Sequence, residues 1–151
     1  MGVKEALAEL GLELPPVAAP VAAYVPAVRS GNHVYTSGQL PMVDGKLAAT
    51  GKVGADVTPE QGKELAQRCA LNALAAIDSV VGVDAVVRIV KVVGFVASAD
   101  GFTGQPGVVN GASELLGSVF GDGGQHARSA VGVAELPLGA PVEVELIVEV
   151  G

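Results

Sequence analysis

The chain has 151 residues, and its 9 Lys and Arg against 16 Asp and Glu give a net charge of −7 and a pI near 4.7. The length is that of one domain of about 150 residues. The acidic balance has the wrong sign for a surface that neutralises a phosphate backbone, so nucleic acid is a disfavoured partner. Val and Ala supply 50 residues and aromatic side chains only 3%. We therefore expect a core of small branched side chains.

Cys69 is the single cysteine, which excludes an internal disulfide and a cysteine-cluster metal site and is typical of a reducing compartment. The first ten residues contain Lys4, Glu5 and Glu9 and so lack the layout of a secretory signal. The longest uncharged stretch, residues 14–28, is interrupted by four prolines and is too short to span a bilayer. These features predict a cytoplasmic protein with no membrane partner.

The first third of the chain predicts a short helix, an extended arm and a hairpin. Apolar residues at helical spacing predict the helix over Val3–Leu10, and the prolines of Leu14–Pro20 predict the arm. Two strand-like runs follow, Tyr24–Arg29 and His33–Gln39, and the Gly31-Asn32 turn between them is typical of a β-hairpin. We assign residues 1–20 to the helix and arm and residues 21–151 to the main domain.

Two long helices and a Val-rich strand come next. The segment Thr58-Pro59-Glu60-Gln61 has the pattern of a capping box with proline at the first helical position, and Gly82 is a suitable end for the helix that it starts. The run Val86–Val96 has the composition of a covered strand. Apolar spacing predicts a second helix from about Pro106 to Gly121.

The chain closes with two strand-like segments, Arg128–Glu135 and Val142–Val150, which we expect to pair as a hairpin. The whole order predicts an α+β fold in which one mostly antiparallel sheet carries two helices on one face. The far face of so Val-rich a sheet needs a cover, and a second copy of the chain would supply it. A closed homo-oligomer is therefore expected.

Two charged positions on these last strands are candidates for chemistry. Arg128 shares its strand face with the small residues Ala130 and Gly132. This face either forms the floor of a carboxylate-binding pocket, or it packs closely against a helix or a neighbouring chain while Arg128 pairs with a structural acid. Glu143 lies on an acidic face that Ile147 interrupts. It is either an ordinary solvated carboxylate or a partly buried one that exchanges a proton with a ligand.

Several common sites are absent from the sequence. No glycine-rich segment ends in Gly-Lys-Ser/Thr, no dinucleotide fingerprint follows a first strand, and no Gly-x-Ser-x-Gly elbow occurs. The histidines His33 and His126 do not have metal-ligand spacing with each other or with Cys69. We therefore expect neither a cofactor nor a metal.

Four separated segments carry a family resemblance. They are His126-Ala-Arg-Ser-Ala-Val-Gly-Val-Ala-Glu-Leu-Pro137 with the following Val142-Glu-Val-Glu-Leu, Tyr35-Thr-Ser-Gly-Gln-Leu-Pro41, Ile89-Val-Lys-Val-Val-Gly-Phe-Val96, and Asn110 in the second long helix. In this order and spacing they resemble the Rid family (YjgF-like, reactive intermediate deaminases), part of which has been labelled endoribonuclease L-PSP. The N-terminal helix and arm are similar to those of a longer subgroup.

The resemblance implies a chorismate-mutase-like two-layer fold, a homotrimer, and clefts between subunits that bind small carboxylates without a cofactor. In the deaminase branch of the family, 2-imino and enamine acids are hydrolysed to 2-keto acids and ammonia. By position, Arg128 resembles the arginine that binds the substrate carboxylate, and Glu143 the glutamate that orients the attacking water. Residues at cleft-lining positions of the family are Tyr24, Ser37, Gly38 and Asn110.

The chain departs from the family pattern at three places. His126 stands where many members have proline, Ala130 stands where a cysteine is common, and Ala23 replaces the proline before Tyr24. Ala130 leaves more room in the implied cleft. Three functions follow in order of preference: hydrolytic deamination, non-catalytic binding of a small carboxylate or regulation of a partner enzyme, and ribonuclease activity.

Overall fold

A computed structural model describes residues 2–20 and 23–151. Met1 and residues 21–22 lie outside the described residues, and the boundary predicted after residue 20 falls there. Among the described residues, no helix combines the length and the apolar character that crossing a membrane requires.

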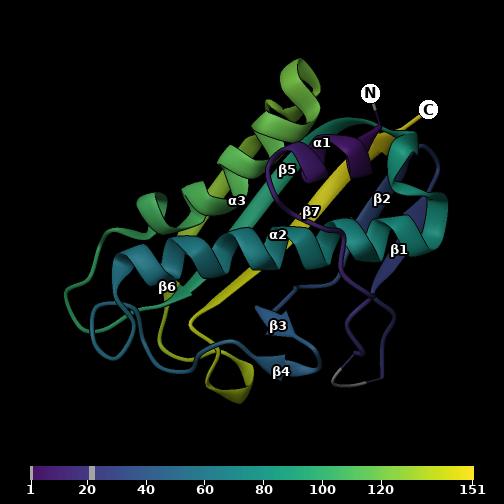
Figure 1. The fold of residues 1–151 in the computed structure, drawn as a ribbon. Helices are drawn as coiled ribbons and strands as arrows, with labels where there is room; N and C mark the ends of the chain where they lie inside the picture. The colour runs from purple at the N-terminus through teal and green to yellow at the C-terminus, as the bar shows by residue number, and fades with distance from the viewer. Residues whose placement is uncertain (1, 21–22) are drawn as a thin grey trace.

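Five strands form one twisted sheet (Figure 1). Its strand order is β1-β2-β7-β5-β6, and every neighbouring pair is antiparallel except β5 and β6. The predicted α+β class with a mostly antiparallel sheet is thus confirmed. The strands are β1 (Ala27–Ser30), β2 (His33–Thr36), β5 (Val86–Ala97), β6 (Ala127–Val133) and β7 (Val142–Val150), and a separate small ribbon pairs β3 (Met42–Val43) with β4 (Lys46–Leu47).

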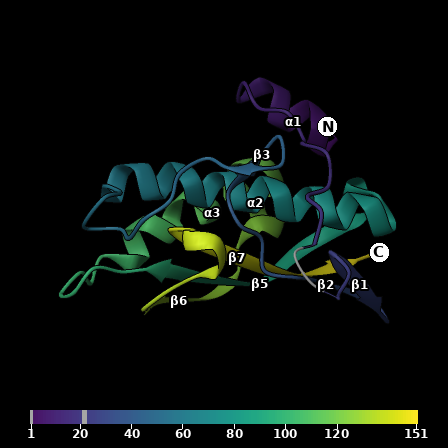
Figure 2. The same ribbon diagram turned by 90° about the horizontal axis from the view of Figure 1, so that it is seen from below.

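Two helices cover one face of this sheet, α2 (Pro59–Val81) and α3 (Gln105–Phe120). Their apolar sides and the inward residues of the strands form one core, which consists mainly of Val, Ala and Leu, as the composition predicts. Figure 2 shows the sheet edge-on, with both helices on one side; in the part of the chain that the structure describes, no helix lies on the other side. The far face exposes apolar side chains, including Val28, Tyr35 and Val131.

The N-terminal helix α1 (Val3–Glu9) forms a third layer outside α2 and α3 (Figure 2). Its Leu7 is fully buried. The backbone N–H of Val3, at the start of the helix, donates to the carboxylate of Asp84 over 2.8 Å. Asp84 belongs to a short 3-10 turn, η1 (Val83–Ala85), that precedes β5.

The predicted hairpin between the last two strands is wrong. β6 pairs in parallel with β5, and β7 lies on the other side of β5, between β5 and β2. The order β5, α3, β6 is therefore a crossover unit, in which a helix returns the chain to run parallel beside the first strand. The short connection with η3 (Pro137–Gly139) carries the chain past the end of β5 instead of reversing it beside β6.

The first hairpin is confirmed, although its strands are shorter than predicted. β1 begins only at Ala27, because Pro26 has no N–H to donate to a ladder. β2 ends at Thr36, whose hydroxyl accepts the N–H of Leu146 over 2.9 Å in place of a backbone carbonyl. This early ending frees the segment after β2 to form part of a cleft.

The predicted capping box at α2 is present. Thr58 Oγ1 accepts the N–H of Gln61 over 3.1 Å, and Gln61 Oε1 accepts the N–H of Thr58 over 2.9 Å.

Replacing Thr58 with Ala is expected to lower the free energy of unfolding by about 1 kcal/mol, and the midpoint of thermal unfolding by about 2–4 °C. Ser118→Ala, at an exposed position inside α3, is the control. It should be neutral or slightly stabilising, because Ala is the better helix former. Equal losses in both variants would contradict the role of the cap.

Candidate functional site

Four predicted residues line one cleft of about 350 Å³ beside the C-terminal strand. The cleft is on the far face of the sheet, because Val142 and Val144 point into the core and Glu143 between them points away from it. Its volume lies in the range of small-molecule sites. The lining residues are Tyr24, Ser37, Gly38, Leu40, Pro137 and Glu143.

The segment after β2 forms one wall of this cleft. The ladder between β2 and β7 ends with the Thr36 hydroxyl on Leu146, and it resumes only at Gln39, which exchanges two backbone hydrogen bonds with Val144 at 2.8 and 3.0 Å. Ser37 and Gly38 are therefore unpaired with β7 and lie beside Glu143. A methyl group on Gly38 would overlap the Glu143 carboxylate, so glycine is the residue that fits here.

The hydrogen-bond groups in this wall have defined roles. Ser37 Oγ donates to the carbonyl of Val25 over 2.6 Å, so its proton is engaged and its oxygen is left as an acceptor. The Ser37 N–H donates to Pro26 over 2.8 Å. Within the described residues, the N–H of Gly38 has no hydrogen-bond partner. The cleft thus offers a ligand one backbone donor close to the Glu143 carboxylate.

Partial burial raises the pKa of Glu143 above its ordinary value, and the negative charge of Glu145 raises it further. Of the two interpretations of the acidic strand face, the structure thus favours a partly buried carboxylate at Glu143. A carboxylate with a raised pKa is a stronger base than a free one, so Glu143 is suited to accept a proton from water.

The raised pKa of Glu143 also predicts how stability depends on pH. The folded state binds this proton more tightly than the unfolded state, so the contribution of Glu143 becomes less favourable as pH rises from the ordinary carboxyl range through the raised pKa. Glu143→Gln should therefore gain stability relative to the parent as pH increases, and lose that gain at lower pH. Urea unfolding between pH 4 and pH 8 measures the difference, with Glu149→Gln as the control for one charge less on the same strand. A difference that shrinks with rising pH would contradict the prediction.

Gly38→Ala tests the close contact with Glu143. The added methyl group must displace the carboxylate, and a misplacement of this size costs a reacting group on the order of 10²-fold in rate. The measurement is the hydrolysis of a 2-imino acid, the reaction that the family resemblance implies. Gly117→Ala, at an open position on α3, is the matched control and should keep parental turnover. Full activity of Gly38→Ala would show that the placement of Glu143 does not matter.

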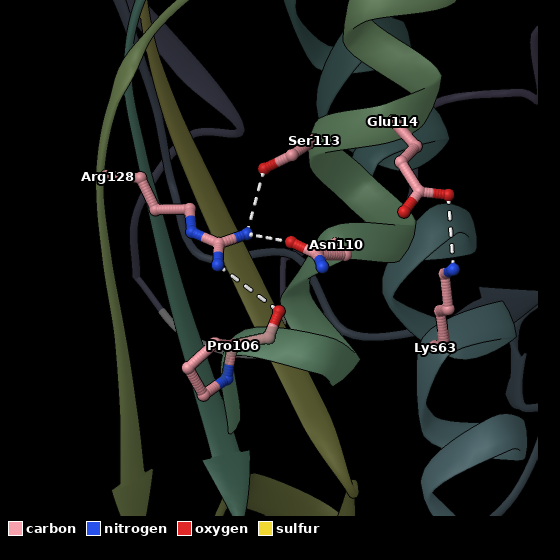
Figure 3. A network of polar contacts seen from close by, with 6 residues as sticks. All are labelled: Lys63, Pro106, Asn110, Ser113, Glu114 and Arg128. Atoms are coloured by element: carbon pink, nitrogen blue, oxygen red, sulfur yellow. Dashed lines mark hydrogen bonds and ion pairs between the residues drawn. The ribbon is translucent and has the colours of Figure 1, made fainter. Parts of the chain in front are cut away.

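Arg128 and Asn110 form a second group on the opposite face of the sheet (Figure 3). Arg128 extends from β6 toward α3, and its Nη1 donates to Asn110 Oδ1 over 2.8 Å and to Ser113 Oγ over 3.1 Å. Its Nη2 donates to the carbonyl of Pro106 over 3.2 Å. Positions 106, 110 and 113 lie on one face of α3, since they are three and four residues apart.

The guanidinium of Arg128 is held by neutral oxygens and keeps unused donors. Among the described residues, no carboxylate lies within ion-pair distance of Arg128. The ion pairs that these residues form are Lys52–Glu135 and Lys63–Glu114, each at 3.1 Å. Among the described residues, Arg128 thus has no structural acid as a partner within its own chain. Of its five N–H donors, three are used, which leaves the Nε–H and one Nη2–H. This pair is suited to a carboxylate.

The small-residue face of β6 is partly covered. A side chain on Gly132 would meet Gln105 and Ser98, so this end of the strand packs against the start of α3. Ala130 is half-buried against the core. The close-packing interpretation thus applies to Gly132, whereas Arg128 extends to α3 and keeps two N–H donors that are not used there.

The two groups do not meet within one chain. Arg128 points toward α3, whereas Glu143 points to the other face of the sheet. In the strand register Val92 is opposite Arg128, and Phe95 is opposite both Val131 and Glu143. The Cα atoms of Arg128 and Glu143 are thus separated by two strand spacings across the sheet and three residues along it, which amounts to roughly 14 Å.

Sequence patterns missed some residues of both groups. Ser113 and the Pro106 carbonyl hold Arg128, and their helical spacing from Asn110 was the available signal. Leu40 and Pro137 line the Glu143 cleft, and both stand inside the quoted family motifs.

Cys69 is fully buried, its Sγ lies 3.7 Å from the Val142 carbonyl, and burial together with the Glu143 charge raises the pKa of its thiol. In the described part of the chain, no three His, Cys, Asp or Glu side chains gather in a way that would hold a metal.

Comparison with known proteins gives a family and several relatives. Residues 4–150 match the family described as "YjgF/chorismate mutase-like, putative endoribonuclease". Protein TCP17 of Trypanosoma cruzi is 47% identical over 145 residues, covering 95% of this chain and 91% of TCP17. A 2-iminobutanoate/2-iminopropanoate deaminase of Dermatophagoides farinae is 34% identical over 130 residues, covering 85% of this chain and 87% of the relative.

A crystal structure agrees with the sequence matches. It is that of an Agrobacterium tumefaciens protein of unknown function, 45% identical, with a TM-score of 0.90 over 98% of this chain and 91% of the other. The family match spans nearly the whole chain, and the fold, the motifs and the relatives agree. The chain therefore belongs to the YjgF/chorismate mutase-like family, the Rid-like family that its motifs resemble.

Proposed function

We propose that the protein hydrolyses reactive 2-imino and enamine acids to 2-keto acids and ammonia. The observation that carries the proposal is the guanidinium of Arg128, which is held by three neutral oxygens, faces no carboxylate among the described residues, and keeps two N–H donors. A planar cation held in this way binds a carboxylate through paired hydrogen bonds. The deaminase relative at 34% identity supports the same substrate class.

The chemistry needs only water, because an imine carbon is already electrophilic. Arg128 binds the carboxylate of the substrate, and Glu143 accepts a proton from a water molecule whose oxygen forms a bond to the imine carbon. The nitrogen receives the proton held by Glu143 and then the hydroxyl proton of the adduct, the C–N bond breaks, and ammonia leaves as the C=O bond forms. One 2-imino acid and one water thus give one 2-keto acid and one ammonia, and Glu143 returns to its starting state.

Arg128 and Glu143 must then act from different subunits. They lie on opposite faces of the sheet in one chain, and the far face carries exposed apolar side chains that another copy of the chain would cover. We therefore place the complete site in a cleft between protomers of a closed homo-oligomer, as the resemblance implies for a trimer. Each protomer supplies Arg128 to one cleft and Glu143 to another.

Turnover is tested by generating 2-iminobutanoate with a dehydratase and following the release of the keto acid. The dehydratase alone gives the spontaneous rate, and the proposal expects a faster release when the protein is added. Release at the spontaneous rate over a wide range of protein concentration would overturn it.

Mixing two inactive variants tests the shared cleft. Arg128→Ala and Glu143→Gln protomers that are unfolded and refolded together should form mixed oligomers, in which about a quarter of the clefts contain both native side chains. Keto-acid release should therefore recover to about that fraction of the parental rate. A monomeric parent in sedimentation, or mixed oligomers without any recovery, would show that the cleft is not shared.

A binding protein without turnover is the second candidate. TCP17, at 47% identity, has a name that states no activity, and His126 and Ala130 depart from the pattern of the deaminase branch. Binding of 2-oxobutanoate that raises the melting temperature and is lost in Arg128→Ala, without any turnover, would favour this candidate. Ribonuclease activity is disfavoured by the net charge of −7.

A further inference from the structure

His126 is linked to Arg128 through a single hydroxyl group. It lies in the short segment between the 3-10 turn η2 (Gly121–Gly124) and β6, and it is half-buried. Its Nδ1 is 2.6 Å from the carbonyl oxygen of Gly124, and its Nε2 is 2.9 Å from Ser113 Oγ. The same Ser113 Oγ lies 3.1 Å from Arg128 Nη1.

The chemistry of these groups fixes the direction of the chain of hydrogen bonds. A carbonyl oxygen only accepts, so the ring proton is on Nδ1 and points to Gly124. In the neutral ring Nε2 is then an acceptor, and the Ser113 hydroxyl donates to it. With its proton turned toward His126, Ser113 presents a lone pair to Arg128. Every bond thus runs from Arg128 through Ser113 and His126 to the backbone, an arrangement in which the bonds strengthen one another.

We propose that His126 is a positioning residue that orients Arg128 through Ser113. This inference rests on the proposed role of Arg128 in carboxylate binding. Without an acceptor at Nε2, the Ser113 proton is free to turn toward Arg128, where it would oppose the Nη1–H. Arg128 has no counter-charge among the described residues and stands on an edge strand, so its orientation depends on such neutral contacts.

Two substitutions of His126 separate this role from simple packing. In His126→Gln the amide oxygen reaches the place of Nε2 and accepts from Ser113, whereas in His126→Asn the shorter amide replaces only the Nδ1 contact to Gly124. His126→Asn and Ser113→Ala should weaken binding of 2-oxobutanoate roughly three- to tenfold, and His126→Gln should restore most of it. In turnover the loss should raise KM and leave kcat unchanged, because the carboxylate contact is common to ground and transition states. The double variant His126→Asn with Ser113→Ala should be no weaker than either single one.

The Nε–H resonance of Arg128 in the nuclear magnetic resonance spectrum gives a readout that needs no ligand. We expect it to shift and broaden in His126→Asn and Ser113→Ala and to stay near its parental position in His126→Gln, with thermal unfolding as the check that each variant is folded. An unchanged Arg128 resonance in both His126→Asn and Ser113→Ala would overturn the inference, and so would equal losses of affinity in the Asn and Gln variants. If the parent binds no carboxylate, the proposed function fails, and the resonance still decides whether His126 orients Arg128.

Discussion

Replacement of Arg128 with Lys is expected to lower kcat/KM for a 2-imino acid by about 10- to 150-fold, which corresponds to the loss of about 1.5–3 kcal/mol of charge-assisted hydrogen bonding. Lysine keeps the positive charge but has no planar pair of donors, and it is unable to hold the contacts to Asn110, Ser113 and Pro106 at the same time. Keto-acid release at several substrate concentrations gives the ratio.

Arg29→Lys is the matched control. Arg29 lies on β1, at the other end of the sheet, and its Nε donates to the carbonyl of Gly31 over 3.0 Å. Its replacement should leave turnover at the parental value. Parental kcat/KM in Arg128→Lys would mean that carboxylate recognition does not use the guanidinium.

Glu143→Gln is expected to lower kcat by about 10²- to 10⁴-fold with little change in KM, because glutamine is nearly the same size but is unable to accept a proton from water. Steady-state rates measured against substrate concentration separate the two constants. A variant that loses affinity and keeps kcat would show that Glu143 binds substrate and does not activate water.

Glu145→Gln, two residues along the same face, is the companion variant. This variant should retain kcat. The acidic limb of its pH–rate profile should move to lower pH, because the negative charge of Glu145 raises the pKa of Glu143 in the parent. A large loss of kcat in Glu145→Gln would assign the water-activating role to the pair instead of to Glu143 alone.

Local sequence patterns were sufficient to predict the elements whose determining residues lie close together in the chain. The capping box at Thr58 and Gln61 spans four residues, and the hairpin between β1 and β2 depends on one Gly-Asn turn. Both are stabilised by hydrogen bonds that the nearby residue types dictate. The family motifs extend this to the site, because four of the named residues, Tyr24, Ser37, Gly38 and Glu143, line one cleft.

Strand pairing over longer distances was not visible in the pattern. Two strands joined by a short proline-containing connection look the same whether the connection reverses the chain beside its neighbour or carries it past a third strand. Helix α3 connects β5 to β6 and packs closely on β5, because Val109 lies against Gly94, where any side chain would overlap Val109. The chain that leaves α3 therefore returns beside β5, and β6 pairs with β5. The face on which Arg128 meets α3 depends on this crossover, so only the fold showed that Arg128 and Glu143 lie on opposite faces of the sheet.

The contact between Val3 and Asp84 determines when the N-terminal helix is able to form. A helix of seven residues does not persist on its own in water, because so short a segment does not repay the cost of nucleation. Its first amide is satisfied by a carboxylate 81 residues away, and its Leu7 is buried only when the later helices are packed. Helix α1 is synthesised before the elements on which it packs, yet it folds only after those elements have formed.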